Sequence, residues 1–266
     1  MNSTIAEQDI TCQSAAKGMS KSRFFRAYVF EAKYESLRML RAPAFAGPFL
    51  VLPVGLYLLF AVLLFRSAIG KDPAAGLFTF TGFCILGVMG PGLFGFGTTV
   101  AMEREQGLLR LKRALPMPPG ASLVAKLLMS MLFVLLIMLT MAGAAPLGHL
   151  GLSANQLLWF SLVNILGAMP FCALGLYVGS LASAKAAPAF LNLFYLPMIY
   201  LSGILFPLPK SMHWMATLSP AYHLEQLGLA SMRLPSAGSS AVHLLVLMAI
   251  TLGFTALALR RLSRVG

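Results

Sequence analysis

Residues 77–120 read LFTFTGFCILGVMGPGLFGFGTTVAMEREQGLLRLKRALPMPPG, and this stretch decides the fold. The part over residues 77–101 contains no Asp, Glu, Lys or Arg. A helix needs about 20 apolar residues to cross a bilayer core of about 30 Å. Charged residues begin abruptly at Glu103, as expected where a helix leaves the hydrocarbon. The stretch therefore predicts a transmembrane helix that is followed by a charged segment outside the membrane.

The composition of the whole chain agrees with this prediction. Of the 266 residues, 58% are hydrophobic and 11% are charged, whereas soluble domains average roughly 45–50% and ~25%. Intrinsic disorder requires low hydrophobicity and is excluded. Three cysteines are too few for a disulfide-rich secreted domain. The chain is therefore expected to lie in a membrane.

Further uncharged apolar runs occur along the chain. A soluble helical bundle would show charged faces at helical period, and none of these runs does. They predict an all-α integral membrane protein with six transmembrane helices, although Pro197 interrupts the fifth. The predicted spans are residues 44–65, 77–101, 127–145, 157–182, 188–206 and 241–259, with a flexible tail over 1–21 and a short tail over 260–266.

The basic residues predict the orientation of the spans. The chain has 20 Lys and Arg residues and a net charge of +12. With six spans, 16 of the 20 fall on the side of the two termini and 4 on the other side. The positive-inside rule then places both termini in the cytoplasm of a bacterial-type inner membrane. Nucleic-acid binding is the alternative for a basic chain, but these charges are spread over separate segments, so no nucleic-acid partner is expected.

Three segments outside the spans carry patterns of their own. Residues 22–43 predict an amphipathic helix that lies in the membrane interface. In the charged link over 102–120, Leu108, Leu111 and Leu115 recur at helical spacing, and prolines end the pattern. Residues 207–240 are too apolar for a free loop and too rich in proline for a span, so we expect a re-entrant hairpin. This hairpin contains Glu225, an ionisable residue that is a functional candidate or a plain water-facing side chain.

These residues resemble the ABC-2 type permease family of ABC transporters. Glu103-Arg104-Glu105-Gln106-Gly107-Leu108 is similar to a cytoplasmic Glu-Arg-Glu-x-Gly segment of that family, although Leu109 departs from the pattern. Leu201-Ser202-Gly203-Ile204-Leu205-Phe206-Pro207 is similar to the end of its fifth span, and Trp214 and Pro220 follow at the usual places. The amphipathic segment over 22–43 is similar to its elbow helix.

The resemblance implies a six-span exporter subunit that works with a separate P-loop ATPase. The residues that would couple to the ATPase are Glu103, Arg104, Glu105, Gly107, Leu108 and Leu111, and those of an outer gate are Phe206, Pro207, Trp214 and Glu225. Two permease subunits would enclose the pathway, as a homodimer or a heterodimer. This chain has no Gly-x-x-x-x-Gly-Lys-Ser/Thr loop, so ATP and Mg²⁺ are expected on the partner and no cofactor on this chain.

The residues themselves suggest what the pathway would carry. Aromatic and Met side chains adapt to varied apolar ligands, which favours a drug-like or lipid-like substrate; candidate lining residues are Phe83, Met89, Phe94, Asn192, Tyr195 and Met198. Plain helix packing is the alternative for each of them, and Gly175 and Gly179 predict a close helix contact. Export of a polysaccharide, a lipid-linked glycan or sodium, and a non-transporting six-span assembly protein, remain open alternatives.

Enzymatic activity and proton transport are disfavoured by the same sequence. The predicted spans contain no acidic residue of the kind that carries protons. The chain has no His-Glu-x-x-His motif, so no metal site is expected. Cys84 and Cys172 lie in apolar runs without basic neighbours and are expected to be inert.

Overall fold

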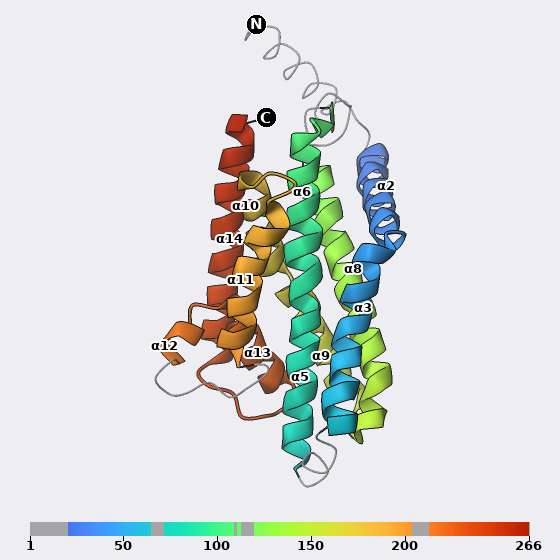
Figure 1. Cartoon of the computed structure of the whole chain (residues 1–266), viewed down its shortest axis with the longest axis vertical. Helices are drawn as coiled ribbons and strands as arrows, with labels where there is room; N and C mark the ends of the chain where they lie inside the picture. Colours follow the sequence, from blue (N-terminus) through green and yellow to red (C-terminus); the bar gives the residue numbers. More distant parts are fainter. Residues whose placement is uncertain (1–20, 65–71, 109–110, 113–119, 204–212, 266) are drawn as a thin grey trace, which may run out of the picture.

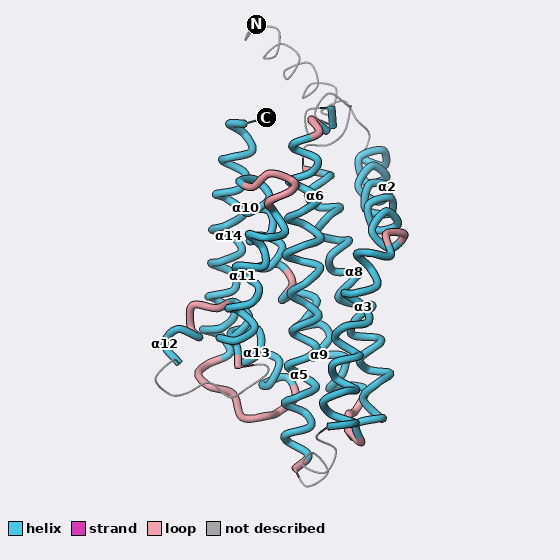
Figure 2. Tube along the Cα trace, in the orientation of Figure 1, coloured by secondary structure: helices cyan, strands magenta, loops and turns pink. Residues whose placement is uncertain are grey.

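The structure is a computed structural model, and it describes residues 21–64, 72–108, 111–112, 120–203 and 213–265. Within these ranges every regular element is a helix (Figure 2). The predicted all-α fold is therefore confirmed for the described residues. The predicted tail before Lys21 lies outside them.

The first two helices meet at a sharp break. Helix α2 covers Lys21–Leu40 and α3 covers Pro43–Tyr57, after which the π-helical segment η1 runs over Leu58–Leu64. Ala42 between them is extended, with φ −95° and ψ 92°, as steric contact with a following proline favours. In Figure 1, α2 lies beside the upper part of α8, and α3 continues below it.

One continuous helical stretch occupies the centre of the bundle. It consists of α5 (Pro73–Gly90), the π-helical segment η2 (Pro91–Gly95) and α6 (Phe96–Glu105) (Figure 1). In the 18-residue apolar segment of this stretch, 78% of the residues are buried, against 17% in the corresponding segments of the first and the last candidate spans. Pro91 lacks the N–H of an α-helical hydrogen bond, which accounts for the irregular segment at this point.

Three further long helical stretches surround the central one. The first joins α8 (Ala121–Ala144) to η3 (Ala145–Gly148), and the second joins α9 (Ala154–Gly167) to α10 (Met169–Leu181). The third is α14 (Ser240–Val265). Together with the stretches over Pro43–Leu64 and Ala74–Glu105, they make five helices in the described residues that are long and apolar enough to span a membrane.

The fifth predicted span is shorter than expected. Its helix, α11, covers Ala187–Ser202, and Gly203 ends it in the left-handed conformation with φ 80°. At ~1.5 Å per residue, 16 residues reach roughly 24 Å, less than the bilayer core of about 30 Å. Residues 204–212 lie outside the described ranges, and with them the candidate gate residues Phe206 and Pro207. The predicted span over 188–206, and with it the total of six spans, therefore stays a prediction.

In its described residues, the region predicted as a re-entrant hairpin contains two short helices. These are α12 (His213–Ala216) and α13 (Pro220–Ser231). Helix α13 packs against α14, α9, α11 and α5. It therefore belongs to the folded bundle and not to a free loop.

Glycines allow α10 to approach the central stretch closely. A Cβ atom added to Gly175 would lie 2.7 Å from the carbonyl oxygen of Leu93, and one added to Gly179 would collide with the carbonyl oxygen of Gly97. Only residues without side chains permit this distance between backbones. The predicted close contact at Gly175 and Gly179 is present, and its partner is η2 with α6.

We predict that Gly175→Ala destabilises the protein, because the new methyl group would push two backbones apart. Overpacking of this kind costs about 1–3 kcal/mol. Gly253→Ala on α14 is the matched control, since a Cβ atom there meets nothing within 4 Å. Thermal unfolding in detergent should show a lower midpoint for Gly175→Ala only. Equal midpoints for the two variants would contradict this packing.

Candidate functional site

The candidate site is the last turn of α6, where Glu103, Arg104 and Glu105 follow one another. Successive residues of an α-helix point about 100° apart. The three side chains therefore reach different neighbours: Glu103 turns toward α2 and α8, and the other two turn toward the α10–α11 connection. We call this end of the bundle the α6 end, and the opposite end the α13 end (Figure 1).

Glu103 binds a fully buried lysine. Its Oε1 accepts a hydrogen bond of 2.8 Å from Nζ of Lys126, which is 0% exposed. The same Nζ donates to Oε1 of Glu35 over 2.5 Å. Lys126 belongs to α8 and Glu35 to α2, so one ammonium group joins three helices.

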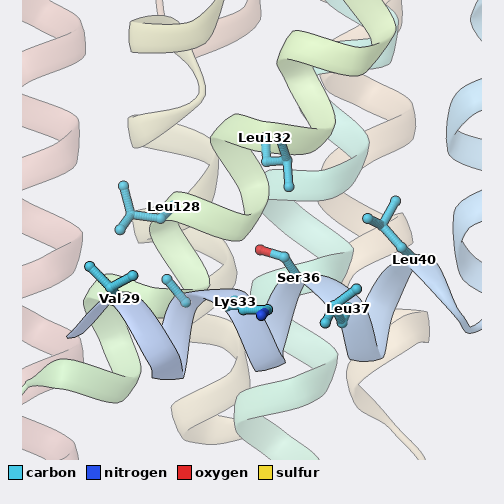
Figure 3. A pocket seen from close by; sticks show the side chains of 8 residues that line it. Val29, Lys33, Ser36, Leu37, Leu40, Leu128 and Leu132 are labelled. Carbon is cyan, nitrogen blue, oxygen red and sulfur yellow. The ribbon is translucent and has the colours of Figure 1, made fainter. Parts of the chain in front are cut away.

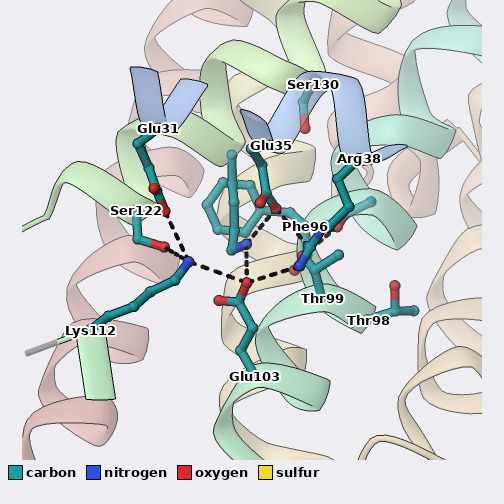
Figure 4. Close-up of polar contacts among 12 residues, drawn as sticks. Glu31, Glu35, Arg38, Phe96, Thr98, Thr99, Glu103, Lys112, Ser122 and Ser130 are labelled. Atoms are coloured by element: carbon teal, nitrogen blue, oxygen red, sulfur yellow. Dashed lines mark hydrogen bonds and ion pairs between the residues drawn. The ribbon is translucent and has the colours of Figure 1, made fainter. Parts of the chain in front are cut away.

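Three more charged residues surround this centre. Arg38 donates to Glu35 over 2.8 Å and to Glu103 over 3.4 Å. Lys112 donates to Glu31 over 2.9 Å and to Glu103 over 3.4 Å. We call the whole set the ion cluster; it consists of Glu31, Glu35, Arg38, Glu103, Lys112 and Lys126 (Figure 4).

The ion cluster is balanced in charge. It contains three carboxylates and three cationic side chains. Burial lowers the pKa of Lys112, but the hydrogen bond to Glu31 and the charge of Glu103 outweigh burial, so this pKa lies above its ordinary value. Buried charges need such complete pairing, because an unpaired one has lost its hydration without compensation.

Arg104 and Glu105 hold the connection between α10 and α11. The guanidinium of Arg104 donates to the carbonyl oxygen of Ser180 and, over 2.6 Å, to that of Ala182. Oε2 of Glu105 accepts a hydrogen bond of 2.6 Å from the amide of Ala184. Arg261 of α14 also donates to Ser180, over 3.4 Å. The last turn of α6 is thus bonded to elements on both sides of it.

Gly107 ends α6 in a way that few other residues permit. Its φ is +72°, in the left-handed region, and its amide donates to the carbonyl oxygen of Arg104 over 3.1 Å. Glycine at this position is the usual way to stop a helix. The chain then turns again, with Leu108 half-buried and Leu111 59% exposed. Residues 109–110 and 113–119, which carry most of the predicted Leu108–Leu115 helix, lie outside the described ranges.

The sequence reasoning placed Glu103 in a coupling segment but missed its partners. Glu31 and Glu35 lie four residues apart, on one face of α2, and this spacing signals paired carboxylates. Lys126 stands alone at the start of an apolar run. A lone lysine there calls for a carboxylate partner, and that signal could have linked α2, α6 and α8.

Helix α2 turns its acids inward and its aromatic residues outward. Phe25 is 69% exposed and Tyr34 65%, whereas Glu35 is buried. This is the reverse of a helix on a soluble protein, and an outward apolar face suits contact with lipid. An open groove of about 430 Å³ lies between α2 and α8 (Figure 3); it is lined by Val29, Ala32, Lys33, Ser36, Leu37, Leu40, Leu128 and Leu132.

The candidate pathway residues differ in their surroundings within the single subunit. Phe83, Met89 and Met198 are buried in the core of the chain. The half-buried Phe94 and Tyr195 stack edge to face, with ring centroids 5.4 Å apart. Asn192 is the exposed member of the set. In this conformation, three of the six side chains therefore serve the packing of a single subunit.

The described gate residues at the α13 end differ in their surroundings. Trp214 of α12 is 66% exposed. Glu225 of α13 is 1% exposed, and neither of its carboxyl oxygens has a hydrogen-bond partner among the described residues. Burial raises the pKa of Glu225 to about 8. The plain water-facing reading of Glu225 is therefore wrong, because the side chain is inside the fold.

We predict that Lys126→Met destabilises the protein strongly. The substitution leaves Glu35 and Glu103 without their central cation, and breaking a buried pair costs about 3–5 kcal/mol. Lys185→Met is the matched control, because Lys185 is exposed on the α10–α11 connection. The midpoint of thermal unfolding and the yield of folded protein should fall for Lys126→Met only. Restoration by Glu103→Gln in the same chain would be partial, since Glu35 would still lack the Lys126 ammonium group and would keep only Arg38 as a partner.

We predict that Glu225→Gln changes how stability depends on pH. The folded-state pKa lies above the ordinary value, so ionisation in the unfolded chain opposes folding increasingly from about pH 4.5 to about pH 8. Glutamine does not ionise, so the variant gains stability relative to the parent protein as pH rises. Unfolding midpoints at pH 5 and pH 8 measure this gain. A constant difference between the two proteins at both pH values would contradict a buried neutral carboxyl group.

Comparison with known proteins agrees with this architecture. A family model described as "ABC-2 type transporter" matches residues 28–232. The chain is also 25% identical, over 193 residues, to a Bacillus subtilis (strain 168) protein named "Putative transport permease YvfS". The match covers 71% of this chain and 78% of that protein. The chain is a multi-pass membrane protein that belongs to the ABC-2 type transporter family, and it is a transporter subunit.

Proposed function

We propose that this chain is the membrane subunit of an ATP-driven exporter and that a separate ATPase docks at the α6 end. Family membership supports an ATPase partner in general. The observation that carries the proposal is the double attachment of the last turn of α6. Its three charged residues hold α2 and α8 on one side and the α10–α11 connection on the other. A movement imposed there would reach three neighbouring elements at once.

The docking surface would consist of the segment that follows this turn. Leu111 is an exposed leucine directly beyond Gly107, and exposed apolar side chains at such a place fit a protein partner. Glu103 would act indirectly, because it is buried within the ion cluster. Glu105 would position the α10–α11 connection, whose amide at Ala184 it binds. ATP and Mg²⁺ would bind to the partner ATPase.

The topology follows from the same assignment. If the ATPase docks at the α6 end, that end and both termini lie in the cytoplasm of an inner membrane. The α13 end then faces outward. A second permease subunit, identical or related, would complete the transport pathway. Exposed apolar side chains on α11 support this arrangement, since they fit lipid or a second copy; they are Phe190, Leu193, Phe194, Leu196 and Tyr200.

Hydrophobic drug-like or lipid-like molecules are the proposed substrates. The apolar runs over 77–101 and 188–206 contain no charged residue that would hold an ion or a sugar acid. A polysaccharide, a lipid-linked glycan or sodium would travel by the same architecture. These alternatives can be ranked by how strongly each compound stimulates ATP hydrolysis by the assembled complex.

We predict that Glu105→Ala uncouples ATP hydrolysis from transport and leaves the protein in the membrane. The substitution removes the bond to the α10–α11 connection but leaves the buried ion cluster intact. Transport into vesicles and ATP hydrolysis are measured together, and the amount transported per ATP hydrolysed should fall several-fold. Arg264→Ala in the last turn of α14 is the control, because it also removes one charge at the α6 end.

The first experiment is a mild-detergent pull-down of the tagged chain, followed by mass spectrometry and an ATPase assay. A stoichiometric P-loop ATPase supports the exporter. Absence of any ATPase from folded protein would favour the non-transporting assembly protein. Unchanged transport by Glu105→Ala would contradict a coupling role for Glu105 but would not contradict the exporter assignment.

A further inference from the structure

Two buried histidines meet at the α13 end. His223 belongs to α13 and is 4% exposed, and His243 belongs to the first turn of α14 and is 6% exposed. Their Nδ1 atoms are 2.7 Å apart. This is the length of a hydrogen bond, so one of the two nitrogens must carry a hydrogen and the other must accept it.

The other nitrogen of each ring faces a backbone carbonyl group. Nε2 of His223 lies 2.8 Å from the carbonyl oxygen of Thr217, and Nε2 of His243 lies 2.6 Å from that of Ala237. A carbonyl oxygen can only accept a hydrogen bond. Both Nε2 atoms must therefore carry hydrogen, which fixes the state of each ring.

Counting hydrogens gives the charge of the pair. The three contacts require three N–H groups, and two neutral imidazoles supply two. With both Nε2 atoms protonated and both rings neutral, two lone pairs would face each other over 2.7 Å. We propose that His223 and His243 bind one additional proton, shared between their Nδ1 atoms, and that this proton fastens α13 to α14.

A metal ion fits this pair less well than a proton. Zinc–nitrogen bonds of about 2.0–2.1 Å in tetrahedral geometry would separate the two ligand atoms by roughly 3.3 Å. The observed separation is 2.7 Å. In the described part of the chain, no group of three or more His, Cys, Asp or Glu side chains is placed to hold a metal ion. The geometry therefore matches a hydrogen bond.

The proton also fixes the connection between α13 and α14. This connection covers residues 232–239, and Ala237 in it is held from two sides. Its carbonyl oxygen binds His243, and its amide donates to Oε1 of Gln226 over 2.7 Å. Gly238 follows with φ +78°, against the His243 ring. Without the shared proton at most two of the three histidine contacts can persist, so one of these attachments must open.

The surroundings determine the direction of the pH response. Burial and the charge of His243 lower the pKa of His223, and the Thr217 carbonyl group opposes them without reversing the shift. Because the pKa of Glu225 is raised to about 8, its carboxyl group is mostly neutral below that pH. The other titratable and charged groups on α13, on the connection to α14, and on α11 and α5 are Tyr222, Glu225, Arg233, Tyr195, Tyr200 and Cys84. Helix α14 adds Arg260, Arg261 and Arg264, and α10, which packs against α14, adds Cys172 and Tyr177. The Tyr222 ring lies 5.5 Å from that of His223. The pair therefore holds its proton in acid and releases it as pH rises.

Nitrogen NMR of ¹⁵N-histidine-labelled full-length protein in nanodiscs tests this proposal directly. At pH 5 the four ring nitrogens of the pair should carry three hydrogens, with a coupling between the two Nδ1 nuclei. At pH 8 they should carry two, and the coupling should be lost. His223→Gln and His243→Gln assign the signals, and His149→Asn, in the connection between α8 and α9, is the matched control.

Hydrogen exchange of the amides over 232–242 supplies a second measurement on the parent protein alone. After correction for the intrinsic pH dependence of exchange, protection should be roughly tenfold or more greater at pH 5 than at pH 8, because a charge-assisted hydrogen bond is lost. Four hydrogens on the pair at pH 5, an unchanged two from pH 4 to pH 8, or pH-independent protection would each overturn the proposal. None of these results depends on whether the chain exports a substrate.

Discussion

The ammonium group of Lys126 is the constraint on which the α6 end of the molecule depends. It is fully buried and lies between Glu35 of α2 and Glu103 of α6. A charge in that position is tolerable only if its partners stay within bonding distance. Helix α2 therefore cannot leave the bundle without separating the buried Glu35 carboxylate from the Lys126 ammonium group. The apolar contacts of α2 alone would not impose this, because its aromatic side chains face outward.

The central stretch is the complement of this polar end. Gly92, Gly97, Gly175 and Gly179 bring two backbones together without intervening side chains, and Pro91 interrupts the regular hydrogen bonding in the same region. The close backbone contact and the π-helical segment both belong to the helical stretch that has the largest buried share among the candidate spans. Tight packing of α10 fixes the position of α6, and the position of α6 in turn fixes where Glu103, Arg104 and Glu105 can reach.

Hydropathy predicted most of the architecture, because length and absence of charge are local properties of the sequence. The helices over Pro43–Leu64 and Ala121–Gly148 could be expected on that ground. The ion cluster could not be expected in the same way, because its directly bonded members are up to 91 residues apart and their pairing depends on how helices pack. The shortness of α11 was hidden for another reason. Its apolar run continues to Phe206, but the left-handed Gly203 ends the helix earlier.

The fan of charges at the end of α6 has a mechanical consequence. Glu103 is bound to Lys126 of α8, whereas Arg104 and Glu105 are bound to the α10–α11 connection, so rotation of α6 about its own axis would break at least one attachment. Helices α2, α6 and α8 and the α10–α11 connection must consequently travel as a single rigid block. Any hinge has to lie beyond this block, and the π-helical segment Pro91–Gly95 borders it in the middle of the central stretch. A force applied to the last turn of α6 would therefore tilt all the elements of this block together.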